Sequence, residues 1–171
     1  MVFRTANTLN VTYAAGNQGY YGSFFSSLDQ SDGVNTPTLF YAENTAENNG
    51  VTMELGSSGK KSRMTFANAG TYNIQFSAQA HHLGGGGAGD TVNIWFRLNG
   101  SDIANSDTKL TISSSSPYAV PSWNFIVSVT AGQYVELVYS SDNANIVFEA
   151  EAATASHPAF PSLILTAVQV R

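Results

Sequence analysis

The side chains that could carry catalysis or bind a metal ion are few in this sequence and lie far apart along it. His81 and His82 are adjacent, and neighbouring side chains of a strand point to opposite faces, so the two are poorly placed to share a metal ion. His157 stands in a segment before a proline. Glu149 and Glu151 would share a strand face about 7 Å apart, which suits two glycosidase carboxylates, although solubilising carboxylates are far more common.

These residues predict that the chain is not an enzyme. We expect no catalytic residue, no cofactor and no metal site within one chain. A glycan-processing enzyme is the remote alternative, and one histidine from each of three subunits meeting on an axis is the alternative metal site. The sequence has no cysteine, which excludes disulfides, thiolate nucleophiles and thiolate metal ligands together.

Two acidic loops offer the oxygen ligands that calcium prefers. The residues from Asp102 to Asp107 form one, and Asp142 with Asn143 forms the other. Such oxygens could hold calcium, but these residue types are more often plain turns. Calcium is therefore the alternative to the expected absence of a cofactor.

Aromatic residues beside polar loops make carbohydrate recognition a stronger alternative than catalysis or metal binding. Tyr118 and the two tryptophans are the candidates. Trp123 is in phase with Phe125 and Val127, which predicts a place in the core. Trp95 is out of phase with the apolar residues of its own strand, so we predict that it is the candidate ligand contact.

Charge and composition exclude several other function classes. The 171 residues include 12 acidic and 7 basic side chains, for a formal net charge of -5. Nucleic acid is an unexpected partner because the sole basic cluster is Lys60, Lys61 and Arg63. No secretory signal and no apolar run long enough for a membrane span are present, so we expect neither export by that route nor membrane insertion.

Alternation of apolar and polar residues recurs through the chain and predicts an all-β sandwich of about ten strands. Tyr72 to Ala78 and Val92 to Leu98 alternate most clearly. Asn99 and Gly100 follow the second of these, and this pair favours a type I′ hairpin turn. The other predicted strands cover residues 20–28, 38–42, 51–55, 63–66, 101–104, 120–129, 133–140, 145–151 and 162–170.

Three strands break the rule that one face is polar. Residues 163–170, 134–139 and 20–28 carry apolar side chains on both faces. A two-layer sandwich buries one face of each sheet, so the second apolar face needs a cover. We predict that another copy of the chain supplies it; a covering loop is the alternative. The glycine-rich run from Leu83 to Asp90 is predicted to be a mobile loop at one end of the sandwich.

The chain resembles a known family over residues 20–170. The segment MTFANAGTYNI, from Met64 to Ile74, is similar to the signature of the jelly-roll domain shared by complement C1q heads and tumour necrosis factor ligands, with Met64 and Ile74 where that pattern has Phe. PSLIL at Pro161 to Leu165 replaces the Phe-Ser-Gly of animal C1q heads, so animal receptors are not implied. Five segments resemble the C1q-like domains of bacteriophage structural proteins: YYGSFFS, FANAGTYNIQFSAQ, WFRLNG, VPSWNFIVSVTAGQYVELVYSS and PSLILTAVQV.

The resemblance implies a C1q/TNF-like jelly-roll homotrimer whose inner sheets meet at a threefold axis. We place Tyr20, Phe24, Tyr134, Tyr139 and Ile164 at or near that contact. The implied role is a non-enzymatic virion structural protein at the surface of a bacteriophage, assembled in the host cytoplasm: a capsid decoration or cement protein, or a short tail fibre tip. The alternative is a receptor-binding module for host attachment that recognises host-surface glycans.

The first 18 residues precede the family-like domain, which we assign to residues 19–171. Because free termini are usually disordered unless something holds them, we predict that residues 1–18 form an arm that docks onto a neighbouring subunit or another virion protein. Its docking residues would be Arg4, Leu9, Val11 and Tyr13. The absence of a fibrous shaft predicts a small attached component.

Overall fold

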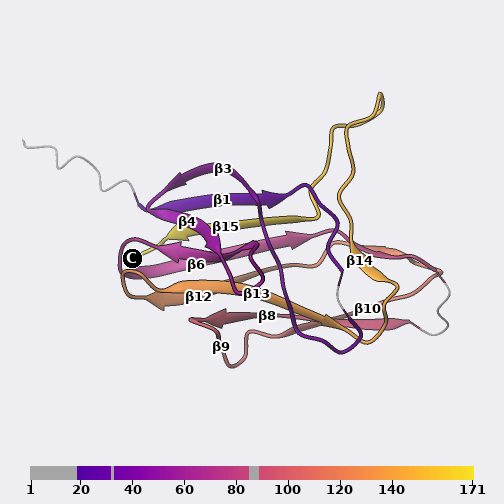
Figure 1. Ribbon diagram of the computed structural model, residues 1–171, viewed down its shortest axis with the longest axis horizontal. Helices are drawn as coiled ribbons and strands as arrows, with labels where there is room; N and C mark the ends of the chain where they lie inside the picture. Colours follow the sequence, from indigo (N-terminus) through magenta and orange to yellow (C-terminus); the bar gives the residue numbers. More distant parts are fainter. Residues whose placement is uncertain (1–18, 32, 85–88) are drawn as a thin grey trace, which may run out of the picture.

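The computed structural model describes residues 19–31, 33–84 and 89–171 and forms a sandwich of antiparallel sheets (Figure 1). The predicted arm and its four docking residues lie outside these ranges, as do residues 85–88 of the glycine-rich run. Among the described residues every regular element is a strand, which confirms the all-β prediction. The strands are β1 (Tyr21–Ser26), β2 (Thr38–Leu39), β3 (Asn44–Asn49), β4 (Val51–Leu55), β5 (Lys61–Phe66), β6 (Gly70–Ala78), β7 (Ala80–His82), β8 (Asp90–Leu98), β9 (Ser101–Asp102), β10 (Thr108–Ile112), β11 (Tyr118–Ala119), β12 (Ser122–Val129), β13 (Tyr134–Ser141), β14 (Ile146–Phe148) and β15 (Leu163–Gln169).

Two large sheets make the layers of the sandwich. The five-stranded sheet has the order β12-β6-β15-β1-β3, and the seven-stranded sheet has the order β10-β8-β13-β5-β4, with β2 paired to β13 and β9 to β8. A small third sheet, β11-β7-β14, lies beside them. Neighbouring strands come from distant parts of the sequence, so most of the fold depends on long-range pairing.

The core lies between the two large sheets and is built by alternation. In β6 the predicted inward residues, from Tyr72 to Ala78, are at most 4% exposed. Phe76 meets Phe96 of the opposite sheet with ring centroids 6.0 Å apart. A second aromatic cluster joins Phe40, Tyr139 and Phe148, with centroids 4.3 to 4.9 Å apart. Because buried residues fix the phase of the long strands such as β6, β8 and β15, their outward residues are fixed as well.

The predicted hairpin turn is confirmed and has a direct structural consequence. Asn99 and Gly100 have φ values of 50° and 82°, the left-handed backbone that a type I′ turn requires. The turn folds β9 back onto β8 and sets Asp102 opposite Arg97. A two-residue return strand thus brings a carboxylate to the outer face of the seven-stranded sheet.

Several strand predictions need correction. β3 was missed because its residues, NTAENN, carry no apolar alternation; it is held by pairing with β1 at the sheet edge. β10 was missed too. The strand predicted over residues 145–151 ends at Phe148, so the prediction that Glu149 and Glu151 share one strand face is wrong.

The three strands with two apolar faces differ in their surroundings. The outer face of β15 is uncovered: Ile164 is 41% and Val168 52% exposed. On β13, by contrast, Val138 is fully buried and Glu136 is 4% exposed, so the chain covers this strand itself. β1 is intermediate, with Phe24 buried inward and Phe25 half-buried outward. The prediction of an uncovered second face therefore holds for β15 and fails for β13.

The buried carboxylate of Glu136 provides a test of how the outer side of β13 is held. Its Oε1 accepts a hydrogen bond from Arg63 Nε at 3.2 Å, and the Arg63 guanidinium lies 4.5 Å from the ring centroid of Tyr134. Removing one partner of a buried ion pair leaves an uncompensated charge. We expect Arg63→Met to lower the free energy of unfolding by about 2–3 kcal/mol, less than for a fully buried pair because Arg63 is 34% exposed.

Urea denaturation measures this change. Adding Glu136→Gln to Arg63→Met removes the unpaired charge and should restore at least about half of the loss. The exposed neighbour Lys61 supplies the control, because Lys61→Met should change the unfolding free energy by less than about 0.5 kcal/mol. Equal stability of Arg63→Met and Lys61→Met would contradict the assignment.

Candidate functional site

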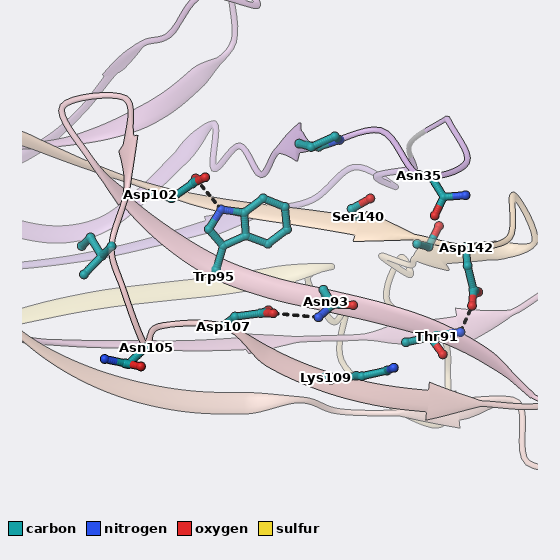
Figure 2. Close-up of a pocket in the computed structure, with 13 residues that line it drawn as sticks. Asn35, Thr91, Asn93, Trp95, Asp102, Asn105, Asp107, Lys109, Ser140 and Asp142 are labelled. Carbon is teal, nitrogen blue, oxygen red and sulfur yellow. Dashed lines mark hydrogen bonds between the residues drawn. The ribbon is translucent and has the colours of Figure 1, made fainter.

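An open groove of about 590 Å³ lies on the outer face of the seven-stranded sheet. Outward side chains of β8 form its floor, since Thr91, Asn93 and Trp95 alternate with the buried residues Val92 and Ile94. Segments from several other elements form its walls (Figure 2). The wall residues are Asn35, Pro37, Asp102, Ile103, Asn105, Asp107, Lys109, Ser140, Ser141 and Asp142.

Trp95 is fixed in the groove by its polar edge. Its Nε1–H donates to Asp102 Oδ1 at 2.7 Å, and Arg97 Nε donates to the same oxygen at 2.6 Å. The Arg97 guanidinium also lies 5.8 Å from the Trp95 ring centroid. The prediction that Trp95 faces away from the core is confirmed: its ring lies half-buried between the Asp102 turn and β13 (Figure 2). Contact with a ligand remains a prediction.

The two acidic loops that the sequence analysis treated separately meet at this groove. Asp107 Oδ2 accepts from Asn93 Nδ2 at 2.8 Å, and Asp142 Oδ1 accepts from the backbone N–H of Thr91 at 2.7 Å. Both carboxylates are thus tied to β8, the strand that carries Trp95. Three of the sequence candidates for ligand binding therefore belong to one site.

A buried hydroxyl holds the loop that carries these acids. Ser106 is 1% exposed; its Oγ accepts from the Phe96 N–H at 3.0 Å and donates to the Ile103 carbonyl at 2.8 Å. Asn105 beside it has φ of 62°, a conformation that Asn tolerates better than most residues. Hydrogen bonds of the buried Ser106 hydroxyl therefore hold this loop against β8.

Sequence reasoning missed Lys109, Asn35 and Ser140 as groove residues. Lys109 pairs with Asn93 across β10 and β8, and Ser140 pairs with Asn93 across β13 and β8. The alternation of Lys109 with Leu110 and Ile112 was a usable signal for β10. Nothing in the sequence placed Asn35 beside a strand so distant along the chain.

None of the three histidines lines the groove, and each lies beside a different acidic residue. His82 is buried, with Nε2 2.6 Å from Asp90 Oδ2, while its Nδ1 accepts from the Gly84 N–H at 3.0 Å. His81 Nδ1 lies 3.0 Å from Glu149 Oε2 without hydrogen-bond geometry. The opposite orientation of the adjacent pair is confirmed. His157 Nε2 lies 3.6 Å from Glu151 in the segment that projects from the sandwich between β14 and β15 (Figure 1).

Over residues 19–31, 33–84 and 89–171 no three histidine, aspartate or glutamate side chains gather closely enough to hold a metal ion. In the same ranges no helix is long and apolar enough to cross a membrane.

The other two aromatic candidates are placed elsewhere. Trp123 is 48% exposed, so its predicted place in the core is wrong. It has the predicted phase, paired with Phe76, but β12 is an edge strand and its first residues extend past the buried part of the core. Tyr118 stacks on His81 with centroids 4.3 Å apart and does not line the groove.

The five residues predicted for contact between copies occupy different environments. Phe24 and Tyr139 are buried in the core of their own chain, with at most 1% exposure, so their side chains offer no surface to another copy. Tyr134 belongs to the seven-stranded sheet, and Tyr20 packs against the core. Ile164 is exposed on the outer face of the five-stranded sheet. Contact between copies itself remains a prediction.

Hydrogen bonds from Arg97 and then Trp95 hold the pKa of Asp102 below its ordinary value of 3.8. A carboxyl whose pKa is lowered by folding stabilises the native state above its ordinary pKa, and that contribution is lost as the pH falls through the lowered value. In Trp123→Phe, where Trp95 is the single tryptophan, we expect the acid transition of tryptophan fluorescence to have its midpoint below 3.8.

Adding Arg97→Met removes the larger cause of the shift, so the midpoint should rise toward 3.8. Lys61→Met in the same background is the matched control, since it removes a cation from an exposed side chain of β5 with little effect on stability. A midpoint that stays unchanged in Arg97→Met would show that the Asp102 contacts do not form in solution.

Comparison with known proteins supports the fold and leaves the family open. No protein-family model matches the chain, and no curated protein sequence matches it. Among solved structures, the crystal structure of murine APRIL at pH 5.0 matches with a TM-score of 0.56 and 10% sequence identity, over 89% of this chain and 99% of that chain. APRIL is a TNF-family jelly-roll protein. The fold of this chain is therefore a TNF-like jelly-roll β sandwich, as the resemblance implied.

Proposed function

We propose that this chain is a non-enzymatic, homotrimeric surface component of a bacteriophage particle, either a capsid decoration protein or a short fibre tip. The TNF-like jelly roll fits a trimeric surface module. The assignment to a bacteriophage particle rests on the resemblance of the sequence to phage C1q-like domains. One observation carries the trimer: on β6, β12 and β15 the outer face of the five-stranded sheet has no charged residue and exposes three apolar side chains, Ile126, Ile164 and Val168. Antibody labelling of intact particles tests the location, and particles without the protein at their surface would refute it.

The uncovered face has a clear cross-strand pattern. Val168 of β15, Asn73 of β6 and Ile126 of β12 form one row across three strands, because Val168 pairs with Asn73 and Asn73 with Ile126. Val168 is 52% and Ile126 60% exposed. A second row contains Ile164, at 41% exposure. Apolar side chains are thus repeated over the face and are not confined to one edge.

The same face carries no charge on these three strands. The outward residues are Thr71, Asn73, Gln75 and Ser77 of β6, Ser122, Asn124, Ile126 and Ser128 of β12, and Ile164, Thr166 and Val168 of β15. Depletion of charged side chains distinguishes the core of a protein interface from the rest of a surface. A neutral face of this kind also meets its own copy without like-charge repulsion, which favours a second copy of the chain as its partner.

A charge placed at the centre of this face should separate the subunits. We expect wild type to have about three times the chain mass of 18.2 kDa by light scattering after size exclusion. Val168→Glu should shift the protein to the monomer mass, because three carboxylates would be buried close together without partners.

Leu55→Glu is the matched control, since Leu55 is 63% exposed on β4 of the other large sheet. It should remain trimeric. A monomeric wild type at micromolar concentration, or a trimeric Val168→Glu, would contradict the proposal.

The groove on the opposite sheet favours a second candidate function, adhesion to host-surface glycans. An aromatic ring beside amide, hydroxyl and carboxylate groups is suited to sugar recognition. In a trimer built through the five-stranded sheet, this groove would face outward. Adhesion and a structural role are therefore compatible in one protein.

An array of bacterial surface polysaccharides tests adhesion. Wild type should bind a subset of them, and Trp95→Ala should reduce that binding at least about tenfold by removing the ring. Trp123→Ala, which removes the exposed tryptophan of the other sheet, should bind as wild type does. An array on which wild type binds nothing would contradict adhesion.

A further inference from the structure

We infer that the groove around Trp95 binds a neutral sugar unit and discriminates against acidic sugars. This inference rests on the proposed adhesion function and names the ligand class of that same site. It follows from three properties of the groove: a fixed aromatic face, a set of partly used hydrogen-bonding groups, and an excess of negative charge.

The aromatic face is held in place before any ligand arrives. Trp95 lies on β8, a strand paired on both sides by β10 and β13. Its one donor, Nε1–H, is already satisfied by Asp102, so the ring offers a ligand its apolar face and no polar edge. The face of an indole is electron-rich, which suits the weakly positive C–H groups on one side of a pyranose ring. Little conformational entropy is then lost on binding.

The hydrogen-bonding groups beside the ring match hydroxyls in kind. Asp107 and Asp142 each use one carboxylate oxygen internally, which fixes their orientation and leaves the second oxygen to accept from a ligand. Asn105, Asn35 and Ser140 add groups that both donate and accept. A hydroxyl likewise donates and accepts, so a ligand with several adjacent hydroxyls can satisfy both kinds of group (Figure 2).

The charges of the groove select against anions. The Asp102 carboxylate is matched by Arg97 at 2.6 Å. Asp107 and Asp142 share the groove with one ammonium, that of Lys109. A sugar carboxylate, sulfate or phosphate would approach this excess of negative charge and be repelled. The amide and hydroxyl donors of the groove would be left unpaired by a simple organic cation, so a neutral polyhydroxyl ligand fits best.

Isothermal titration of the full-length chain with free sugars tests the inference. The probes are the methyl glycosides of glucose, galactose, mannose and N-acetylglucosamine, set against N-acetylneuraminic acid and glucuronic acid. At least one neutral glycoside should bind with a millimolar dissociation constant, and both acidic sugars should bind at least about tenfold more weakly.

Variants separate the ring from the charges. Trp95→Ala should weaken neutral-sugar binding at least about tenfold, whereas Trp123→Ala should leave it unchanged. The double variant Asp107→Asn with Asp142→Asn keeps the side-chain shapes and should tighten acidic-sugar binding several-fold. Because it retains Trp95, it also keeps the inference testable should Trp95→Ala fail to fold, as judged by circular dichroism.

The outcomes distinguish this inference from the function on which it rests. Tight binding of acidic sugars, or no binding of any neutral glycoside at millimolar concentration, overturns the inference, even where wild type still binds acidic polysaccharides on the array and adhesion stands. If neutral glycosides bind in solution but wild type binds nothing on the array, the inference is supported and the adhesion function is refuted.

Discussion

The alternation of buried and outward residues, fixed by the core between the two sheets, is the constraint on which both proposed surfaces depend. Tyr72, Ile74 and Phe76 of β6 cannot leave the core without exposing their side chains to water, and a slip of one residue would exchange the two faces of the strand. Asn73 and Gln75 are therefore outward by necessity. The same reasoning on β8 sends Asn93 and Trp95 to the outer side of the other sheet.

The two outer faces have opposite chemistry. The five-stranded sheet presents a face without charge on β6, β12 and β15, and its apolar residues have no cover from the chain itself. The seven-stranded sheet carries ion pairs, such as Arg63 with Glu136 and Arg97 with Asp102, and it has a groove. An uncharged face has a small desolvation cost when it packs against a copy of itself. A face whose charged side chains are held by hydrogen bonds within the chain is suited to small polar ligands. The two proposed functions, assembly and recognition, are thus assigned to separate sheets.

The sequence predicted the parts of the molecule in which local pattern and tertiary structure agree. The hairpin at Asn99 and Gly100 is an example, because a short turn requires particular residues whatever the rest of the fold does. β3 could not be predicted, since its polar residues form a strand by pairing with β1, which is distant from β3 along the chain. Trp123 had the right phase but lies where the edge strand passes beyond the core, and phase alone does not report how far a core extends.

The candidate site shows the same limit. Trp95 was identified from its phase, and both acidic loops were identified from their ligand types. That they meet could not be predicted, because the pairing of β8 with β10 and β13 decides it, and these pairings join residues up to about fifty positions apart. On β13 the pattern of apolar residues predicted an uncovered second face. The prediction was wrong because Val138 is buried within the chain itself.

Weak binding at each groove is compatible with firm adhesion in a trimer. An open groove with one aromatic face and a few hydroxyl partners gains little free energy per sugar, and millimolar affinity corresponds to about 4 kcal/mol. In a trimer built through the five-stranded sheet, three grooves would face outward on one rigid body. Repeating surface glycans could then engage them together, and linked binding can raise avidity by about 10² to 10⁴ without any new contact. The uncharged face would thereby contribute to recognition by setting the number of sites.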